Sequence, residues 1–283
     1  MKKFAFLSWA VVAALLFTAC GSSPKGYSVV DGVIVFDAPA RAEGQHSVLR
    51  LTTDPMPVVR VGFIGLGMRG PGAVERFTYL DGVEIKALCD LYPDRVEKSQ
   101  EILAGRNLPA AAAYSGEEGW KELCRRDDID LVYICTPWQL HVPMAVYAME
   151  HGKHVAVEVP AAMSLEECWQ LVDTAEKTQR HCMMLENCVY DFFELTTLNM
   201  AQHGLFGEII HTEGSYIHDL DPFWEHYQGN WRLDFNQSHR GDVYATHGLG
   251  PACQLLDIHR GDKMNYLVAM DTKSVNGLKL AKE

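Results

Sequence analysis

The sequence has too few basic residues for a protein that binds nucleic acids. Its 25 lysines and arginines stand against 37 aspartates and glutamates, and the formal net charge is −12. We therefore exclude a nucleic acid as partner, because a negatively charged surface repels a polyanion. The sequence also shows no internal repeat and no long low-complexity tract. With 48% hydrophobic residues, the 283 residues suffice for a sizeable core and one or two domains.

The cysteine spacing of a metal or redox motif is absent as well. None of the 8 cysteines forms a C-x-x-C pair, and several lie in apolar runs. An odd number remains apart from Cys20, and we interpret these as small buried hydrophobic side chains rather than as disulfides. We predict no metal site. The cysteines in question are Cys89, Cys124, Cys135, Cys168, Cys182, Cys188 and Cys253.

No apolar run is long enough for a confident membrane span, and the longest one lies near the start of the sequence. Lys2 and Lys3 precede an apolar stretch at 4–17, which is typical of a signal peptide. Residues 16–20, Leu-Phe-Thr-Ala-Cys, resemble a bacterial lipobox. The resemblance implies that residues 1–19 are removed and that Cys20 is lipidated. We predict an exported lipoprotein, anchored to the membrane through Cys20 on the periplasmic or cell-surface side.

Residues 20–55 are predicted to form an extension or linker before the first domain. Within it, two strand-like halves at 29–35 flank Asp31-Gly32, and Asp-Gly between apolar residues favours a β-hairpin.

A G-x-G-x-x-G motif at 65–70 directly follows an apolar stretch at 58–64, which predicts a buried parallel strand. Gly65 permits a tight turn, Gly67 lets a pyrophosphate approach the backbone, and Gly70 lets the next helix pack closely. The phosphates then lie at a helix N-terminus, where unpaired N–H groups favour anions. The motif predicts a dinucleotide site.

A second apolar strand, at 83–89, ends at Asp90, which lies 20 residues past Gly70. An acid at this distance binds the hydroxyls of the adenosine ribose, and its charge opposes a 2′-phosphate. We therefore predict NAD as cofactor rather than NADP. The alternative, a glycine-rich turn and an unrelated surface aspartate, leaves the order of strand, glycines, helix, strand and acid unexplained.

Strands and helices continue to alternate as far as residue 186. Further strands are predicted at 130–137, 154–160 and 181–185, and helices at 73–79, 93–104, 117–126, 141–150 and 164–179. This alternation predicts an α/β fold with a doubly wound parallel sheet of the Rossmann type over 56–186.

The pattern changes from about residue 187. A longer alternating strand is predicted at 208–217, a polar and aromatic loop at 219–240, a helix that ends near 259 and a strand at 266–270. We predict that 187–283 form a partial α+β substrate domain with an antiparallel sheet. So few strands make a thin sheet.

The order of these landmarks, together with the sequences Cys-Thr-Pro-Trp-Gln-Leu-His at 135–141 and Glu-Val-Pro at 158–160, resembles the Gfo/Idh/MocA family of sugar oxidoreductases. That family usually has a lysine, which helps to deprotonate the alcohol, where this sequence has Val159. The motifs at 158–160, 184–188 and 244–251 together are similar to glycoside hydrolase family 109. This family contains NAD-dependent bacterial α-N-acetylgalactosaminidases.

The resemblance implies roles for particular residues. It implies proton transfer by His247 and Tyr244, assisted by Tyr216. It implies substrate contacts at Tyr216, Arg232, Tyr244, Ala245, Thr246 and His247. Together with the glycine motif, it implies NAD contacts at Gly65, Gly67, Met68, Arg69, Gly70, Asp90, Trp138, Gln139, Leu140, His141, Glu158, Val159 and Asn187.

The resemblance also implies hydrolysis by oxidation at C3 of the sugar, elimination across C2 and C1, addition of water and reduction. NAD is regenerated in each turnover, which fits an exported enzyme. Two alternatives remain open: an NAD-dependent sugar oxidoreductase, and an inactive nucleotide- or sugar-binding remnant. Because the family's chains continue well beyond this length, we expect a C-terminally truncated member. The sequence leaves open the aglycone, the C2 base and the oligomeric state.

Overall fold

The computed structural model describes residues 27–36, 38–220, 222–223, 229–239 and 241–273, together with Val275 and Lys279. The signal peptide and Cys20 lie outside these residues. The chain divides into two units, Met1–Glu43 and Gly44–Glu283. In the first unit, strands β1 (Tyr27–Val30) and β2 (Val33–Phe36) pair antiparallel around Asp31 and Gly32, both of which have positive φ. The predicted hairpin is confirmed.

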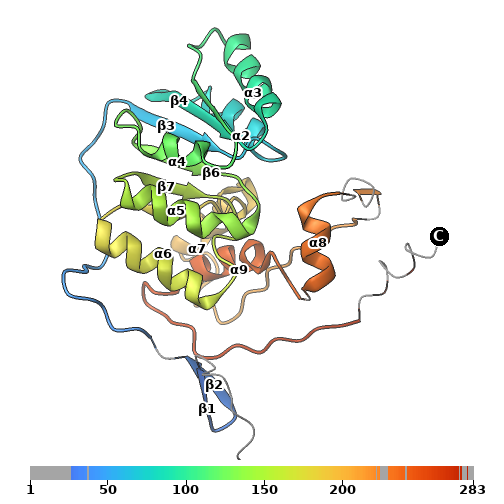
Figure 1. Ribbon diagram of the computed structural model, residues 1–283. Helices are drawn as coiled ribbons and strands as arrows, with labels where there is room; N and C mark the ends of the chain where they lie inside the picture. The colour runs from blue at the N-terminus through green and yellow to red at the C-terminus, as the bar shows by residue number, and fades with distance from the viewer. Residues whose placement is uncertain are drawn as a thin grey trace, which may run out of the picture. The chain divides into compact units, whose positions relative to one another are not determined.

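The described part of the second unit holds a six-stranded sheet of order β5-β4-β3-β6-β7-β8 (Figure 1), and every neighbouring pair is parallel. Chain order reverses between β3 and β6, which is the switch point of a Rossmann-type sheet. The predicted Rossmann fold is confirmed. The strands are β3 (Val59–Ile64), β4 (Val83–Asp90), β5 (Ala112–Ser115), β6 (Leu131–Ile134), β7 (His154–Val157) and β8 (Cys182–Met184). The edge strand β5 was not predicted, because its sequence is short and alanine-rich.

Helices cover both faces of this sheet. On one face α2 (Gly70–Phe77) and α3 (Pro93–Gly105) pack over a core that includes Phe63 and Leu88. On the other, α4 (Gly119–Cys124), α5 (His141–Glu150) and α6 (Leu165–Thr178) pack over Ile64, Val132 and Val157 (Figure 1). A buried core on each face of the sheet, covered by helices, is what the alternation of strands and helices in the sequence predicts.

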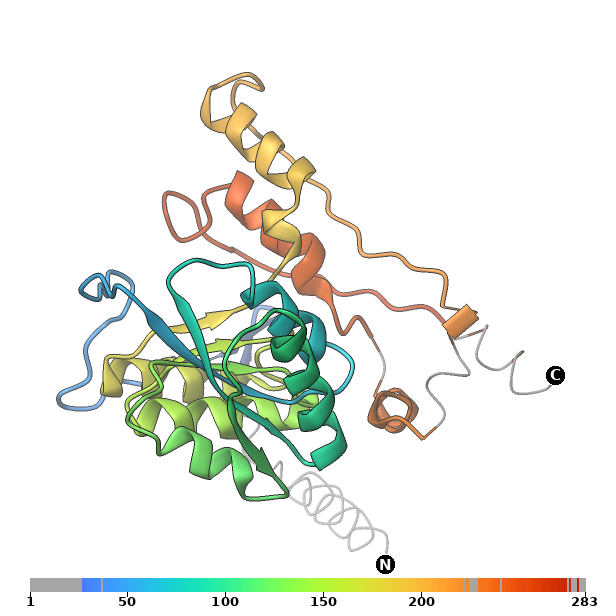
Figure 2. The same cartoon turned by 90° about the horizontal axis from the view of Figure 1, so that it is seen from above.

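The residues from 187 onward differ more from the prediction. The helices here are α7 (Phe192–Gln202), α8 (Trp231–Ser238) and α9 (Ala245–Leu255), preceded by the short 3₁₀ turn η2 (Cys188–Tyr190). A similar turn, η1 (Trp138–Leu140), lies earlier in the chain, between β6 and α5. Helices α7 and α9 pack side by side (Figure 2). Helix α7 was not predicted, and α8 lies where a loop was predicted.

The strands predicted at 208–217 and 266–270 are not strands among the described residues. Both segments carry no regular secondary structure, because no strand within the described part of the chain lies beside them to form the ladder of hydrogen bonds that a sheet requires. The small antiparallel sheet that the described chain does contain is the β1–β2 hairpin. Among the described helices, none combines the length and the apolar character that a bilayer span needs.

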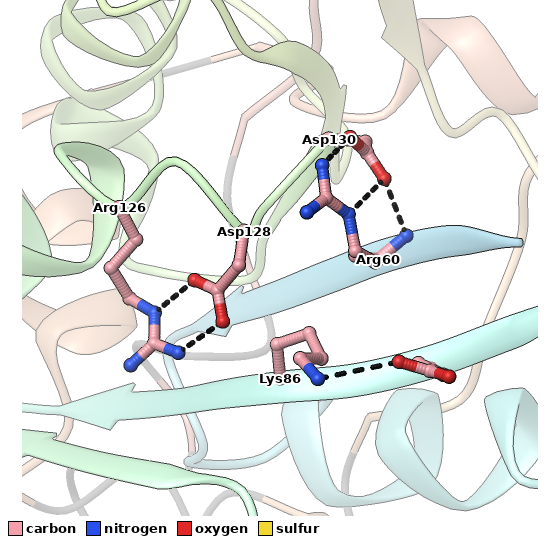
Figure 3. A network of polar contacts seen from close by, with 6 residues as sticks. Arg60, Lys86, Arg126, Asp128 and Asp130 are labelled. Carbon is pink, nitrogen blue, oxygen red and sulfur yellow. Dashed lines mark hydrogen bonds and ion pairs between the residues drawn. The ribbon is translucent and has the colours of Figure 1, made fainter.

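Asp130, which directly precedes β6, bonds to the neighbouring strands β3 and β7 at the end of the sheet away from the glycine motif. Figure 3 shows its contact with Arg60. Its carboxylate accepts two hydrogen bonds from the Arg60 guanidinium, at 2.6 and 2.9 Å, and a third from the Arg60 backbone N–H at 2.9 Å. Its backbone pairs with Arg60 of β3 and with His154 of β7. The hydrogen bonds from Arg60 hold the pKa of Asp130 below its usual value.

This depressed pKa predicts a loss of stability in acid. The contribution of Asp130 is complete above its unfolded-state pKa of about 3.9 and is lost as the pH falls through its lower folded-state value. In urea denaturation, Asp130→Asn is expected to lower the free energy of unfolding near neutral pH, and the difference from the parent is expected to shrink below about pH 4. Asp81→Asn, which changes an exposed carboxylate, is the control. A difference that stays constant with pH would contradict this account.

Candidate active site

The glycine motif forms a turn at the carboxyl end of β3 that excludes larger residues. Gly65 has φ +93°, and a Cβ there would lie 2.7 Å from the backbone carbon of Cys135. A Cβ on Gly70 would lie 2.0 Å from the carbonyl oxygen of Gly65. Only glycine therefore allows the chain to turn against β6 and to begin α2 at once.

Asp90 fixes this turn from the end of β4. Its carboxylate is buried and accepts hydrogen bonds from the backbone N–H groups of Leu66 (2.6 Å) and Tyr92 (3.0 Å). The Arg95 guanidinium lies 3.3 Å from the same carboxylate. A Cβ built on Gly67 meets only that guanidinium, also at 3.3 Å. The backbone at Gly67 is thus bordered by a flexible side chain, which leaves the approach that a pyrophosphate needs.

The crevice at the carboxyl ends of the strands is bordered on its other side, after β6 and β7, by polar side chains. Glu158, which follows β7, is buried and contacts the Arg69 guanidinium at 3.3 Å, while the Tyr133 hydroxyl donates to it at 2.9 Å. The buried Thr136 hydroxyl at the end of β6 has no hydrogen-bond partner among the described residues. An orphaned hydroxyl beside a glycine turn, at the switch point of the sheet, fits a dinucleotide whose polar atoms reach it.

The remaining predicted NAD contacts differ in position. Met68, Gln139, Leu140 and Asn187 are exposed, Val159 is buried, and the Trp138 ring lies within the aromatic cluster described below. The His141 side chain is fully buried, with its ring nitrogens 2.8 Å from the carbonyl oxygens of Pro160 and Thr136. Burial lowers the pKa of His141. The side chain therefore links two loops of the crevice, and the contact of His141 with NAD stays a prediction.

His247 is held by a buried carboxylate. Its Nδ1 lies 2.5 Å and 3.1 Å from the two carboxylate oxygens of Glu186, and both residues are buried. As a carboxylate Glu186 accepts the Nδ1–H, so the neutral ring keeps its lone pair on Nε2. The pair resembles the carboxylate–histidine arrangement that orients a general base.

Glu186 also forms hydrogen bonds with groups other than His247. It follows β8, and it accepts hydrogen bonds from the Cys188 backbone N–H at 3.0 Å and the Thr246 hydroxyl at 3.3 Å. A Cβ on Gly250 would lie 3.0 Å from the Glu186 side chain. The Cys188 sulfur lies 3.3 Å from His247 Nδ1. Burial raises the pKa of the Cys188 thiol to about 11, and the Glu186 charge adds to the rise.

Two aromatic rings, those of Tyr216 and Tyr244, lie beside the His247 ring. The ring of Tyr216 lies 4.5 Å from that of His247 and the ring of Tyr244 lies 5.3 Å from it. The Tyr244 hydroxyl accepts a hydrogen bond from the Arg232 guanidinium. Tyr244 also packs edge-on against Trp138, at 5.4 Å. The structure thus brings together the predicted residues Tyr216, Arg232, Tyr244, His247 and Trp138.

Arg232 reaches this cluster from α8. Its guanidinium lies 5.2 Å from the Trp138 ring and 5.0 Å from the Trp231 ring. The buried Nε of Arg232 has no hydrogen-bond partner among the described residues. A guanidinium with a spare donor, held between aromatic faces, suits a hydroxyl or acetamido oxygen of a sugar. Ala245 and Thr246, two further predicted substrate contacts, form the start of α9 directly after Tyr244.

Tyr216 lies next to His247 because two glycines allow two segments to touch. A Cβ on Gly214 would lie 2.3 Å from the carbonyl oxygen of Gly248, and a Cβ on Gly248 would lie 2.8 Å from the carbonyl oxygen of Gly214. The extended segment therefore crosses α9 backbone to backbone. A groove of about 550 Å³ borders this crossing and is lined by α7, α9 and residues 208–215.

Sequence analysis did not assign functions to two residues of this site. Glu186 directly follows the strand predicted at 181–185, and Thr136 lies at the end of the strand predicted at 130–137. Polar residues at the carboxyl ends of parallel strands face the ligand crevice. That rule alone, applied to every strand, would have found both.

The glycine crossing predicts a stability effect. Gly248→Ala adds a methyl group against backbone, and the free energy of unfolding is expected to fall by about 1 to 3 kcal/mol. Gly105→Ala is the matched control, because its Cβ meets no atom within 4 Å and the position is also helical. It is expected to leave stability unchanged or slightly raised. Equal losses in urea denaturation of both variants would show that the crossing does not matter.

Comparison with known families agrees with this geometry. Residues 59–186 match a family model described as "Oxidoreductase family, NAD-binding Rossmann fold". Residues 190–282 match "Glycosyl hydrolase 109, C-terminal domain". The crystal structure of an NAD binding oxidoreductase from Klebsiella pneumoniae, 22% identical, superposes with a TM-score of 0.54 over 71% of this chain and 54% of that chain. This similarity supports the fold.

Sequence relatives are much closer. "Glycosyl hydrolase family 109 protein 1" of Bacteroides fragilis is 65% identical over 95% of this chain and 58% of the relative. "Glycosyl hydrolase family 109 protein" of Porphyromonas gingivalis is 63% identical over 96% of this chain and 58% of the relative. The chain thus spans less than two thirds of the length of either relative. The Rossmann domain takes NAD as its cofactor, and the chain belongs to glycoside hydrolase family 109, within the Gfo/Idh/MocA oxidoreductases.

Proposed function

We propose that this protein hydrolyses terminal α-N-acetylgalactosaminides, or related α-glycosides, in an NAD-dependent cycle of oxidation, elimination, addition and reduction. The observation that carries the proposal is the buried Glu186–His247 pair, which lies beside Tyr216 and Tyr244. Through Trp138 this cluster adjoins the loop that follows β6. A proton-transfer group therefore lies next to the crevice where the Rossmann sheet binds its dinucleotide.

NAD, when bound, accepts a hydride from C3 of the sugar and returns it at the end of the cycle. The residues suited to hold it are Gly67, Arg69, Asp90, Thr136 and Glu158. Oxidation at C3 acidifies the proton on C2. The chain must then supply a base for that proton and donors for the oxygens of the sugar.

His247 is suited to remove the C2 proton. Glu186 accepts its Nδ1–H and so leaves Nε2 as the acceptor, and the Glu186 charge stabilises the imidazolium that forms. The group on C1 leaves as the C2 proton is taken. Water then adds at C1, and His247, after its proton has exchanged with solvent, protonates C2. Arg232 and the Tyr244 hydroxyl are placed to bind oxygen atoms of the sugar.

Val159 argues against an ordinary sugar oxidoreductase. Its side chain is buried and apolar, so it can neither accept nor donate a proton. A dehydrogenase also accumulates reduced cofactor, whereas the proposed cycle regenerates NAD and needs no second substrate to reoxidise it.

An assay in heavy water tests the proposal. The full chain, supplied with NAD and an aryl α-N-acetylgalactosaminide, is expected to release the aryl group and to place deuterium at C2 of the sugar product. His247→Gln is expected to lower kcat by about 10² to 10⁴-fold, because general base catalysis is lost. His203→Gln, at an exposed position, is the control.

Other outcomes of this assay favour the alternatives. Release without deuterium would contradict the elimination step. Net formation of NADH with free sugar would favour a sugar oxidoreductase. Binding of NAD and sugar without any turnover would favour an inactive binding protein.

We also propose that the protein is exported and anchored to the membrane by a lipid on Cys20. The lipobox-like residues 16–20 support this, and a cycle that regenerates its NAD needs no cytoplasmic pool of cofactor. In cells fed radioactive palmitate, the parent is expected to carry label and to sediment with membranes. Cys20→Ala is expected to lose the label, whereas Cys168→Ala retains it. Label that persists in Cys20→Ala would overturn the proposal.

A further inference from the structure

We propose that Glu186, Cys188 and His247 form a binding site for a borderline divalent cation such as Zn²⁺, and that the bound cation inhibits the enzyme. One ligand atom from each of the three side chains lies within 4.8 Å of the other two. Sequence analysis predicted no metal site, because no cysteine pair has metal-ligand spacing. Folding creates this cluster by bringing α9 against the chain that follows β8.

The distances suit a tetrahedral ion. In tetrahedral zinc sites, Zn–N and Zn–O bonds of about 2.0 to 2.1 Å and a Zn–S bond of about 2.3 Å place the ligand atoms about 3.4 to 3.6 Å apart. Here the Cys188 sulfur lies 3.3 Å, and one Glu186 oxygen 3.1 Å, from His247 Nδ1. The two separations from Nδ1 therefore differ from the tetrahedral values by only a few tenths of an ångström, with Glu186 binding through this more distant oxygen. Glu186 also offers a ligand atom within 4.8 Å of the Cys188 sulfur.

The donor set and its surroundings also favour zinc. Carboxylate, thiolate and imidazole are its usual ligands, and three protein ligands leave a fourth position for water or another small ligand. The Thr246 hydroxyl and the Cys188 backbone N–H already donate to Glu186, which orients the carboxylate as outer hydrogen bonds do in metal sites. Cys188 is only half-buried, and His247 lines the groove between α7 and α9, so the cluster is reachable from solvent.

Binding would change the protonation of His247. The cation takes the lone pair of Nδ1, so the imidazole proton moves from Nδ1 to Nε2, and the thiol proton of Cys188 passes to solvent. With Nε2 protonated and Nδ1 ligated, His247 cannot accept the C2 proton of a sugar. This consequence, inhibition, rests on the proposed function, whereas cation binding itself does not.

Cobalt titration of the full chain, loaded with NAD, tests binding without reference to activity. Co²⁺ is expected to bind once per chain and to show the near-ultraviolet charge-transfer band of a thiolate ligand, and Zn²⁺ is expected to displace it. Cys188→Ser is expected to lose the band and to weaken Zn²⁺ binding at least about tenfold. Cys168→Ser removes an exposed thiol elsewhere and is expected to behave like the parent. A parent chain without the band, or a band that survives in Cys188→Ser, would overturn the proposal.

Activity measurements separate this proposal from the previous one. Zn²⁺ is expected to inhibit aryl glycoside release by the parent and by Cys168→Ser, while Cys188→Ser keeps activity at the same Zn²⁺ concentration. A cobalt band in a chain without glycosidase activity would sustain the metal site and contradict the proposed function. Glycosidase activity that is equally sensitive to Zn²⁺ in the parent and in Cys188→Ser would sustain the function and contradict the inhibitory site.

Discussion

The contact between Glu186 and His247 joins the two halves of the second unit. Glu186 follows the last strand of the Rossmann sheet, and His247 lies in the first turn of α9. Because both side chains are buried, each would leave an unsatisfied polar group if the other were removed, and such groups are costly. The remaining residues around His247 take their positions from the docking of α9 that this contact maintains.

A second constraint places the aromatic residues around that pair. The segment carrying Tyr216 crosses α9 where Gly214 faces Gly248, and any side chain at either position would separate the two backbones. Tyr244, at the start of α9, then contacts Trp138 in η1, the turn that follows the Rossmann strand β6. The cofactor crevice and the residues around His247 therefore share one cluster of aromatic rings. This sharing is what the proposed function requires, because in that cycle a hydride acceptor and a proton acceptor act on neighbouring carbons.

Several features of the fold could be predicted because they depend on local sequence. Helix α5 has the predicted bounds, and β3, β4 and α3 differ from the predictions by only a residue or so. The predictions were poorer beyond residue 187. Residues 208–217 alternate like a strand, yet the described chain offers them no strand to pair with, and a strand is stable only with its neighbour. His141 lies in a motif at the crevice, and only the structure shows that its buried ring contacts the carbonyl oxygens of Thr136 and Pro160.

The sequence by itself determined the Rossmann domain, the glycine turn, Asp90 and the absence of a proton-transferring side chain at position 159. These follow from residue periodicity and from steric limits that act within a few residues of the chain. Only the tertiary structure decided that Glu186 meets His247, that Cys188 joins them, and that Arg232 reaches Tyr244. Those contacts join residues far apart in the chain or in separate elements, so they depend on how whole helices dock rather than on any local pattern.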